Sequence, residues 1–148
     1  MLRAFGFDNA KVLDGGLIRW VQKGYPTSTI PSTYPEQSFT AKPRPGLIIQ
    51  KSEVLEGIHE SNTCIINALS QEQHIGVGGR TYGRPGRIKD SENVPTTELI
   101  DPETNEFYPA AVIAERFASV GTQSSDRVLT YCGGCLLYTS DAADEKRW

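Results

Sequence analysis

The stretch that decides the fold is Arg127-Val-Leu-Thr-Tyr-Cys-Gly-Gly134, where a short apolar run meets a cysteine and two glycines. The run predicts a strand that ends at Cys132. Glycine lets the chain curl tightly, so the N–H groups of Gly133 and Gly134 can surround the sulfur and stabilise a thiolate. We therefore expect Cys132 to be a nucleophile and the chemical centre of the protein. The alternative is a buried structural cysteine beside a turn.

Upstream segments predict a sheet around this strand. The apolar run Thr63-Cys-Ile-Ile66 indicates a buried strand, and helices are expected from Ser52 to about Glu60 and over residues 109–120. Residues 69–94, rich in Gly and Arg, are expected to form turns around short extended pieces. Strand, helix and strand in this order indicate an α/β fold with a parallel sheet, whose ligands bind beyond the carboxyl ends of the strands.

The beginning of the chain indicates the end of a separate domain. Within residues 1–25 we expect a very short strand at Lys11–Leu13 and a helix from Leu17 to about Lys23, a piece too small to fold alone. Residues 26–46 carry five of the nine prolines and predict a linker. A second domain is expected over residues 47–134.

Composition narrows the class of protein. The 148 residues are 38% hydrophobic, enough for one ordinary core but short for two full domains. A net charge of -3 lacks the basic excess of a nucleic-acid binder. No apolar run approaches the roughly 18 residues that span a bilayer, and the start has no signal-peptide layout, so we expect a soluble, cytoplasmic protein. Three cysteines without zinc-type pairing favour a reactive or buried thiol over a disulfide framework or a metal site.

Four cations lie within ten residues of a chain that is acidic overall. Their field would draw an anionic molecule toward Cys132, and the alternative is a solvated loop. The four residues are Arg80, Arg84, Arg87 and Lys89. Among the remaining candidates, His59 and His74 are expected at the surface rather than in acid/base roles. Cys64, inside an apolar run, is expected to pack in the core.

Several short motifs, in their order and spacing, resemble those of tandem rhodanese-type sulfurtransferases. The close of a first domain is matched by Val12-Leu-Asp-Gly-Gly16, Trp20, Gly24 and Pro26. Landmarks of a second domain are matched by Ile66-Asn-Ala-Leu69, Gly86-Arg-Ile88, Asn93-Val-Pro95 and Thr130-Tyr-Cys-Gly-Gly134. The resemblance covers nearly everything from Met1 to Gly134.

This resemblance implies a rhodanese-like open parallel sheet with helices on both faces, incomplete at both ends of the chain. It implies that Cys132 carries sulfur as a persulfide, from thiosulfate or 3-mercaptopyruvate to a thiophilic acceptor such as cyanide or a thiol. The substrate-binding residues would be Gly133, Gly134, Arg84 and Arg87, and Gly133 favours mercaptopyruvate. No metal, cofactor, membrane or nucleic-acid partner is implied. A non-catalytic rhodanese-like module that binds or senses an anion, and a cysteine-dependent phosphatase, are the alternatives.

The sequence departs from the family pattern at several positions. Asn67 and Leu69 replace the usual Asp and Arg, so an internal charge pair is absent and a neutral pairing must substitute. Gln73 stands at about the position of an Arg that helps to bind the donor in some members. Arg87 and Lys89 replace the usual His and Pro. The identity of the donor therefore stays open.

The last fourteen positions, 135–148, resemble the translation of a sequencing adapter and not a rhodanese, which predicts a non-native tail. The first domain and the helix that normally follows the cysteine loop would then be missing. We accordingly expect little activity from this polypeptide itself.

Overall fold

The computed structural model describes residues 1–79, 83–124 and 126–133. Its contacts divide into two units. One consists of Met1–Ile49 with Ile100–Phe107, and the other of Gln50–Leu99 with Tyr108–Trp148. The predicted linker at 26–46 and the predicted domain at 47–134 stay predictions, and the predicted tail at 135–148 lies outside the described residues.

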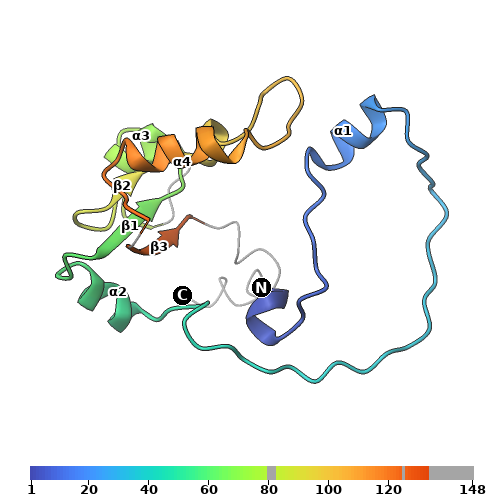
Figure 1. Cartoon of the computed structure of the whole chain (residues 1–148), viewed down its shortest axis with the longest axis horizontal. Coiled ribbons are helices and arrows are strands. Elements are labelled where there is room, and N and C mark those ends of the chain that lie inside the picture. Colours follow the sequence, from blue (N-terminus) through green and yellow to red (C-terminus); the bar gives the residue numbers. More distant parts are fainter. Residues whose placement is uncertain (80–82, 125, 134–148) are drawn as a thin grey trace. The chain divides into compact units, whose positions relative to one another are not determined.

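Three parallel strands form the centre of the second unit (Figure 1). They are β1 (Thr63–Asn67), β2 (Glu92–Asn93) and β3 (Arg127–Tyr131), in the order β2-β1-β3. Both pairings are parallel, with Asn67 opposite Tyr131. Parallel pairing brings the carboxyl ends of the strands to one edge of the sheet. Cys132, which follows β3, therefore lies at the edge that the sequence predicted.

Helices cover both faces of this sheet (Figure 1). α2 (Lys51–Gly57) packs so closely that a Cβ on Gly57 would lie 3.0 Å from the side chain of Leu129. On β1, the Sγ of Cys64 lies 3.1 Å from a threonine hydroxyl in the loop that follows α4 (Ala110–Ala118). Successive side chains of a strand alternate between faces, and the register puts Leu129 and Cys64 on opposite ones. α2 and the end of α4 therefore lie on opposite faces.

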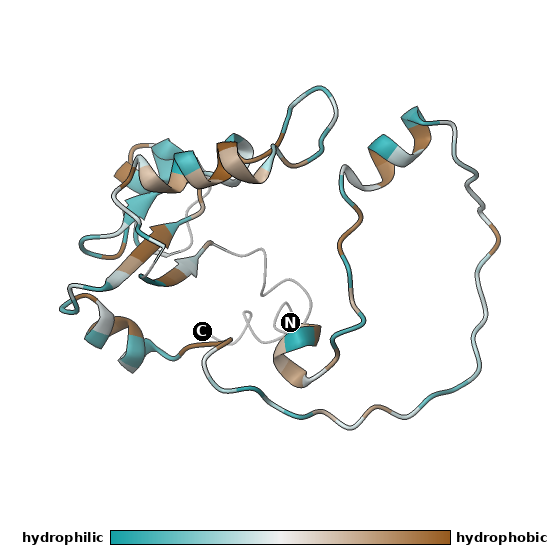
Figure 2. Ribbon diagram, viewed as in Figure 1, coloured by the Kyte–Doolittle hydropathy of each residue, from teal (hydrophilic) through white to brown (hydrophobic). Residues whose placement is uncertain are grey.

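The core of this unit is small and lies on the strands. Ile65, Ile66 and Leu129 are buried, and Val94, directly after β2, is 1% exposed. Figure 2 shows the apolar character of β1 and β3 against the more polar segments around them. Because full burial of one such side chain contributes about 1.5–3 kcal/mol, these few residues supply much of the stability of the sheet.

The structure contains a helix that the sequence did not predict, α3 (Gln71–Ile75). The side chain of Ser70 caps it by accepting a hydrogen bond from the amide of Gln73, and Gly76 ends it in the left-handed conformation with φ of 80°. A helix of one turn is too short to show a hydrophobic period, so residues 69–94 predicted only turns.

The first unit holds little regular structure. It contains a 3-10 turn, η1 (Leu2–Phe5), and α1 (Gly16–Gln22), which matches the predicted helix. The predicted strand at Lys11–Leu13 is wrong, because no described strand pairs with it. A second 3-10 turn, η2 (Thr96–Glu98), follows β2 in the other unit. Across the described ranges, no helix is long and apolar enough to cross a membrane.

The loop Ile100–Phe107 belongs to the first unit through polar contacts with α1 and the residues around it. The carboxylate of Glu106 accepts a hydrogen bond of 2.9 Å from Nζ of Lys23 and forms an ion pair of 3.1 Å with Nε of Arg19. The side-chain amide of Asn105 donates to the carbonyl of Gly15 at 3.1 Å. These contacts hold the loop against the helix.

We expect Ile66→Ala to lower the free energy of unfolding by about 2–5 kcal/mol, because Ile66 is 2% exposed and its loss leaves a cavity in the sheet. Ile75→Ala is the matched control, since Ile75 is 49% exposed, and it should cost about 1 kcal/mol or less. Urea unfolding curves of the two variants measure the difference. Equal losses in both would contradict the assignment of the core.

A pH dependence is expected for the contact between the loop and α1. The hydrogen bond from Lys23, and then Arg19, lower the pKa of Glu106 from its ordinary value of 4.5. A lowered folded-state pKa means that the contact is stabilising above the unfolded-state value and is lost as pH falls through the folded-state value. The protection factor of the Asn105 side-chain amide against hydrogen exchange, followed by NMR, should fall below about pH 4.5 in the wild type. Glu106→Gln should show the lowered protection factor already at pH 7, and a variant with the wild-type protection factor would refute the contact.

Candidate active site

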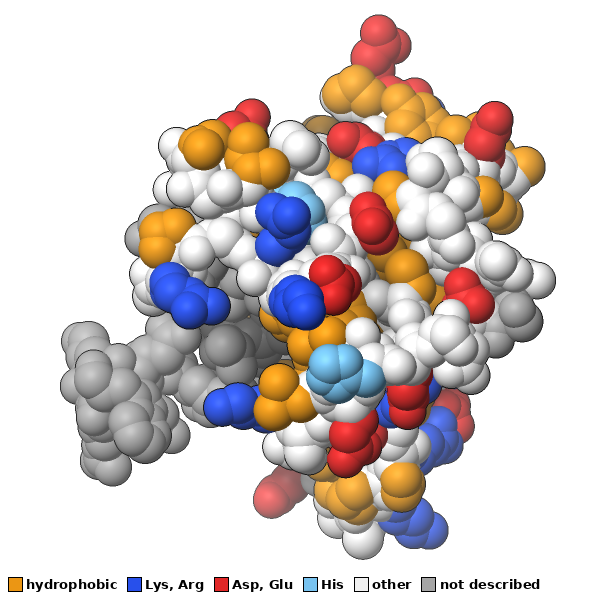
Figure 3. Space-filling model, turned by 90° about the vertical axis from the view of Figure 1, so that its left-hand side faces the viewer, with side chains coloured by type: hydrophobic (Ala, Val, Ile, Leu, Met, Phe, Trp, Pro, Cys, Tyr) orange, Lys and Arg blue, Asp and Glu red, His pale blue; other side chains and the backbone are white. Residues whose placement is uncertain are grey.

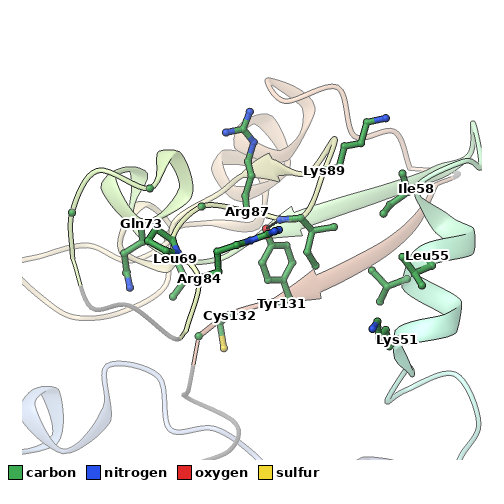
Figure 4. Close-up of a pocket in the computed structure, with 17 residues that line it drawn as sticks. Lys51, Leu55, Ile58, Leu69, Gln73, Arg84, Arg87, Lys89, Tyr131 and Cys132 are labelled. Atoms are coloured by element: carbon green, nitrogen blue, oxygen red, sulfur yellow. Dashed lines mark hydrogen bonds between the residues drawn. The ribbon is translucent and has the colours of Figure 1, made fainter.

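A cavity of about 740 Å³ lies beyond the carboxyl ends of β1 and β3 (Figure 4). Its lining includes Leu69, just after β1, and Cys132, just after β3. One wall is α2, and another is the loop 84–89. The volume falls within the range of about 300–1,000 Å³ that is usual for small-molecule sites.

Cys132 is half-buried and lines this cavity together with Gly133. The carbonyl of Tyr131 accepts a hydrogen bond of 2.9 Å from the amide of Ala68, which fixes the backbone directly before the cysteine. Gly134, the other predicted glycine of the site, lies outside the described residues. The structure therefore brings Cys132 and Gly133 to a cavity, and their chemical roles stay predictions.

Cys64, on β1, is a free, partly buried thiol in this structure. A thiolate is the nucleophile in sulfur chemistry, so any chemistry at Cys132 begins with its reduced form.

Three of the four clustered cations, Arg84, Arg87 and Lys89, line the same cavity. Within the described ranges neither Arg84 nor Arg87 has an ion-pair partner, and Lys89 forms a loose pair of 3.8 Å with Asp90. Arg80 lies outside the described residues. Figure 3 shows Lys and Arg side chains beside hydrophobic ones on one face of the molecule, with acidic side chains between them. The two unpaired arginines are thus available to an anion, and their role as substrate-binding residues stays a prediction.

A further cation, Lys51, reaches the cavity from the first turn of α2, across from Arg84 and Arg87 (Figure 4). Lys51 was not among the predicted site residues, because it lies far from Cys132 in the chain and belongs to no motif. Val54, Leu55 and Ile58 of the same helix form the adjoining apolar wall. The site therefore combines cations on two walls with apolar surface between them.

Two of the departures from the rhodanese pattern, Leu69 and Gln73, line the cavity. The resemblance implies an arginine at position 69 and, in some members, at about position 73. In this chain the wall that includes the start of α3 is neutral at both positions. Within the described residues, the positive charge of the cavity comes from the loop 84–89 and from Lys51. An anion in this cavity would therefore meet positive charge chiefly at these groups.

Asn67 and Asn93 lie opposite each other on β1 and β2, and both side chains bond to backbone groups of the turn after β1. The side-chain amide of Asn93 donates to the carbonyls of Asn67 and Leu69, both at 2.9 Å. The side-chain oxygen of Asn67 accepts from the amide of Leu69 at 2.9 Å. These bonds fix the turn after β1 that leads into the cavity wall.

His74 is only 8% exposed, so the prediction that it lies at the surface is wrong. It sits on α3, the helix that the sequence did not predict, which explains the error. Burial, and then the positive charge of Arg87, lower the pKa of His74, while Glu92 raises it. His59 is exposed, as predicted.

Among the described residues, no group of three or more His, Cys, Asp or Glu side chains could hold a metal ion. The polar groups among the lining residues are cations, a phenol, the sulfur of Cys132, the side-chain amide of Gln73 and backbone amides. Such groups suit an anionic ligand and nucleophilic chemistry at sulfur.

An open parallel sheet with a cysteine at the carboxyl end of a strand is the arrangement of a rhodanese domain, and solved structures agree. The chain superposes on the Escherichia coli protein SseA, whose structure is described as the rhodanese fold of 3-mercaptopyruvate sulfotransferases, with a TM-score of 0.73. The identity is 27%, over 90% of this chain and 49% of that one. The ergothioneine complex of EanB gives a TM-score of 0.76 at 20% identity, over 89% of this chain and 34% of that one. The predicted rhodanese-like α/β fold is confirmed.

Curated proteins confirm the predicted resemblance to rhodanese-type sulfurtransferases, although no protein-family model matches the chain. A putative thiosulfate sulfurtransferase of Mycobacterium bovis is 29% identical over 88% of this chain and 49% of its own length. The 3-mercaptopyruvate sulfurtransferase of Mus musculus is 28% identical over 90% of this chain and 45% of its own. The chain thus spans about half the length of these relatives.

Gly76 allows the close approach of α3 to the loop that carries the arginines. A Cβ on Gly76 would lie 3.1 Å from the amide nitrogen of Gly86. We expect Gly76→Ala to cost more stability than the left-handed backbone strain of roughly 1–2 kcal/mol, because the loop must also move. Gly121→Ala is the matched control, with φ of 83° against 80° and no atom within 4 Å of the added carbon. Thermal unfolding compares the two variants, and equal losses would show that the loop does not press on α3.

Proposed function

We propose that this chain is the cysteine-bearing part of a sulfurtransferase, in which reduced Cys132 carries sulfane sulfur as a persulfide. The observation that carries the proposal is the position of Cys132 at the end of β3, in a cavity that Arg84, Arg87 and Lys51 also line. The curated relatives named as thiosulfate and 3-mercaptopyruvate sulfurtransferases support it.

The first half-reaction loads the cysteine. The thiolate of Cys132 attacks the outer sulfur of thiosulfate, a new S–S bond forms, and the original S–S bond breaks with its electron pair leaving on sulfite. With 3-mercaptopyruvate the thiolate attacks the mercapto sulfur, a new S–S bond forms, and the C–S bond breaks with its electron pair leaving on carbon. The resulting enolate takes a proton at that carbon and leaves as pyruvate. Arg84 and Arg87 hold the anionic donor, and the amide of Gly133 stabilises the negative charge on the sulfur.

The second half-reaction empties the cysteine. A thiophilic acceptor such as cyanide attacks the terminal sulfur, takes it as thiocyanate, and returns Cys132 to a thiolate. The cavity of about 740 Å³ is far larger than cyanide or thiosulfate, so a larger thiol also fits as the acceptor. No cofactor enters either step.

Donor loading tests the proposal. The reduced chain, freed of reductant and incubated with thiosulfate or 3-mercaptopyruvate, should gain the mass of one sulfur atom, and peptide mapping should place it on Cys132. Cys132→Ser should abolish this gain, because the hydroxyl is a far weaker nucleophile. Cys64→Ser is the matched control and should load normally, since Cys64 lies on β1 outside the cavity lining.

Failure of the reduced wild type to load from either donor would overturn the proposal and favour the non-catalytic module that binds or senses an anion. Anion binding without loading, measured by calorimetry with sulfite, would then identify that module. The expectation that this polypeptide turns over poorly stays a separate prediction. Repeated thiocyanate formation from thiosulfate and cyanide, absent in Cys132→Ser, would contradict it.

A further inference from the structure

The hydroxyl of Tyr131 takes part in a closed ring of hydrogen bonds beside the cavity. The amide of Ile88 donates to it at 3.1 Å, and it lies 2.9 Å from Oγ of Ser91. The hydroxyl of Ser91 donates to the carbonyl of Ile88 at 2.8 Å. Because the hydrogen of Ser91 is used on that carbonyl, the hydroxyl of Tyr131 must donate to Ser91. Each hydroxyl then donates once and accepts once.

This ring is sheltered from water. Ser91 is 4% exposed and Tyr131 is half-buried. A hydrogen bond inside a protein is costly to leave unmade, because the abandoned partner stays desolvated. Removing the hydroxyl of Tyr131 therefore leaves the amide of Ile88 without its partner. Removing the hydroxyl of Ser91 takes the acceptor from the hydroxyl of Tyr131, while the carbonyl of Ile88 keeps a bond of 3.2 Å from the backbone amide of Ser91.

The ring joins two parts of the candidate site that are distant in the chain. Tyr131 directly precedes Cys132 and is bonded through its own carbonyl to β1, by way of Ala68. Ile88 stands between Arg87 and Lys89, and both of its backbone polar groups are held by the ring. Figure 4 shows the ring of Tyr131 between Cys132 and Arg87.

Arg87 itself has no ion-pair partner in the described part of the chain that would orient it. Its direction therefore depends on the backbone of the loop, and the backbone is fixed at Ile88. A shift of the loop by a small distance would move the positive charge relative to the sulfur. An error of about 1 Å in such a position is enough to impair binding and reaction in enzyme sites.

We propose that Tyr131 and Ser91 are positioning residues, which hold the cation-bearing loop at the distance from Cys132 at which the anionic sulfur donor binds. This inference rests on the proposed sulfurtransferase function. The two hydroxyls act on donor binding through Arg87 and Lys89, and they take no part in breaking or forming S–S bonds.

The test measures how fast reduced chain gains one sulfur as the thiosulfate concentration rises. Tyr131→Phe and Ser91→Ala should each raise the half-saturating concentration about three- to tenfold, the effect of losing one hydrogen bond, while the maximal loading rate stays within about twofold. The double variant should match either single variant, because the ring is already broken by the first change. Tyr108→Phe is the control, since the described residues offer its hydroxyl no hydrogen-bond partner, and it should behave as wild type.

The outcomes separate the two proposals. Wild-type loading with unchanged half-saturation in Tyr131→Phe and Ser91→Ala would overturn the positioning role and leave the sulfurtransferase function intact. Additive effects in the double variant, or a loss confined to the maximal rate, would also overturn it. If the wild type does not load, both proposals fall. Circular dichroism of each variant ensures that only folded protein is compared, and Ser91→Thr, which keeps the hydroxyl, should restore the wild-type half-saturation.

Discussion

The parallel pairing of β1 with β3 is the constraint on which the rest of the site depends. It joins two segments some sixty residues apart, Thr63–Asn67 and Arg127–Tyr131, and leaves the register no freedom because Ile65, Ile66 and Leu129 are buried. A slip of one residue would turn each of these side chains to the other face. The same register places the end of β3 beside the turn after β1, and Cys132 therefore lies at the edge of the cavity.

The backbone around the site is fixed by hydrogen bonds and not by ion pairs. The turn after β1 is fixed by the amide groups of Asn67 and Asn93, and the residue before the cysteine is fixed by Ala68. The loop with Arg87 is tied to Tyr131. The cationic side chains take no part in these hydrogen bonds, so the backbone that carries them keeps its geometry without their charge.

The sequence predicted the elements that carry a strong local pattern. The apolar runs at 63–66 and 127–131 gave the central strands, and the helical pattern over 109–120 matched α4 within two residues at each end. It could not predict α3, because a five-residue helix stabilised by one serine cap and one glycine has no period. The burial of His74 was missed for the same reason.

The site residues likewise divide into those that the sequence predicted and those that it could not predict. Cys132, Gly133, Arg84 and Arg87 were chosen from local motifs or charge clustering, and they line one cavity. Lys51, Tyr131 and Ser91 were not chosen as site residues, because their relation to the cysteine exists only after the strands have paired and the loop 84–91 has folded back. A lysine at a helix start and a serine in a loop carry no signal until their neighbours are known.

The exchange of a charge pair for amides has an energetic consequence for the turn after β1. Asn67 is fully buried, and among the described residues neither its side-chain nitrogen nor the side-chain oxygen of Asn93 has a hydrogen-bond partner. Each such group costs about 1–3 kcal/mol. A carboxylate at position 67 would remove the orphaned donor, but it would place a negative charge inside the sheet with no arginine at position 69 to compensate it, and an uncompensated buried charge costs more. An amide at position 67 therefore costs less free energy than a carboxylate once Leu69 is present. The departures at positions 67 and 69 are best understood as one coupled change. Together they remove charge from the sheet side of the cavity and leave recognition of an anion to the loop 84–89 and to Lys51.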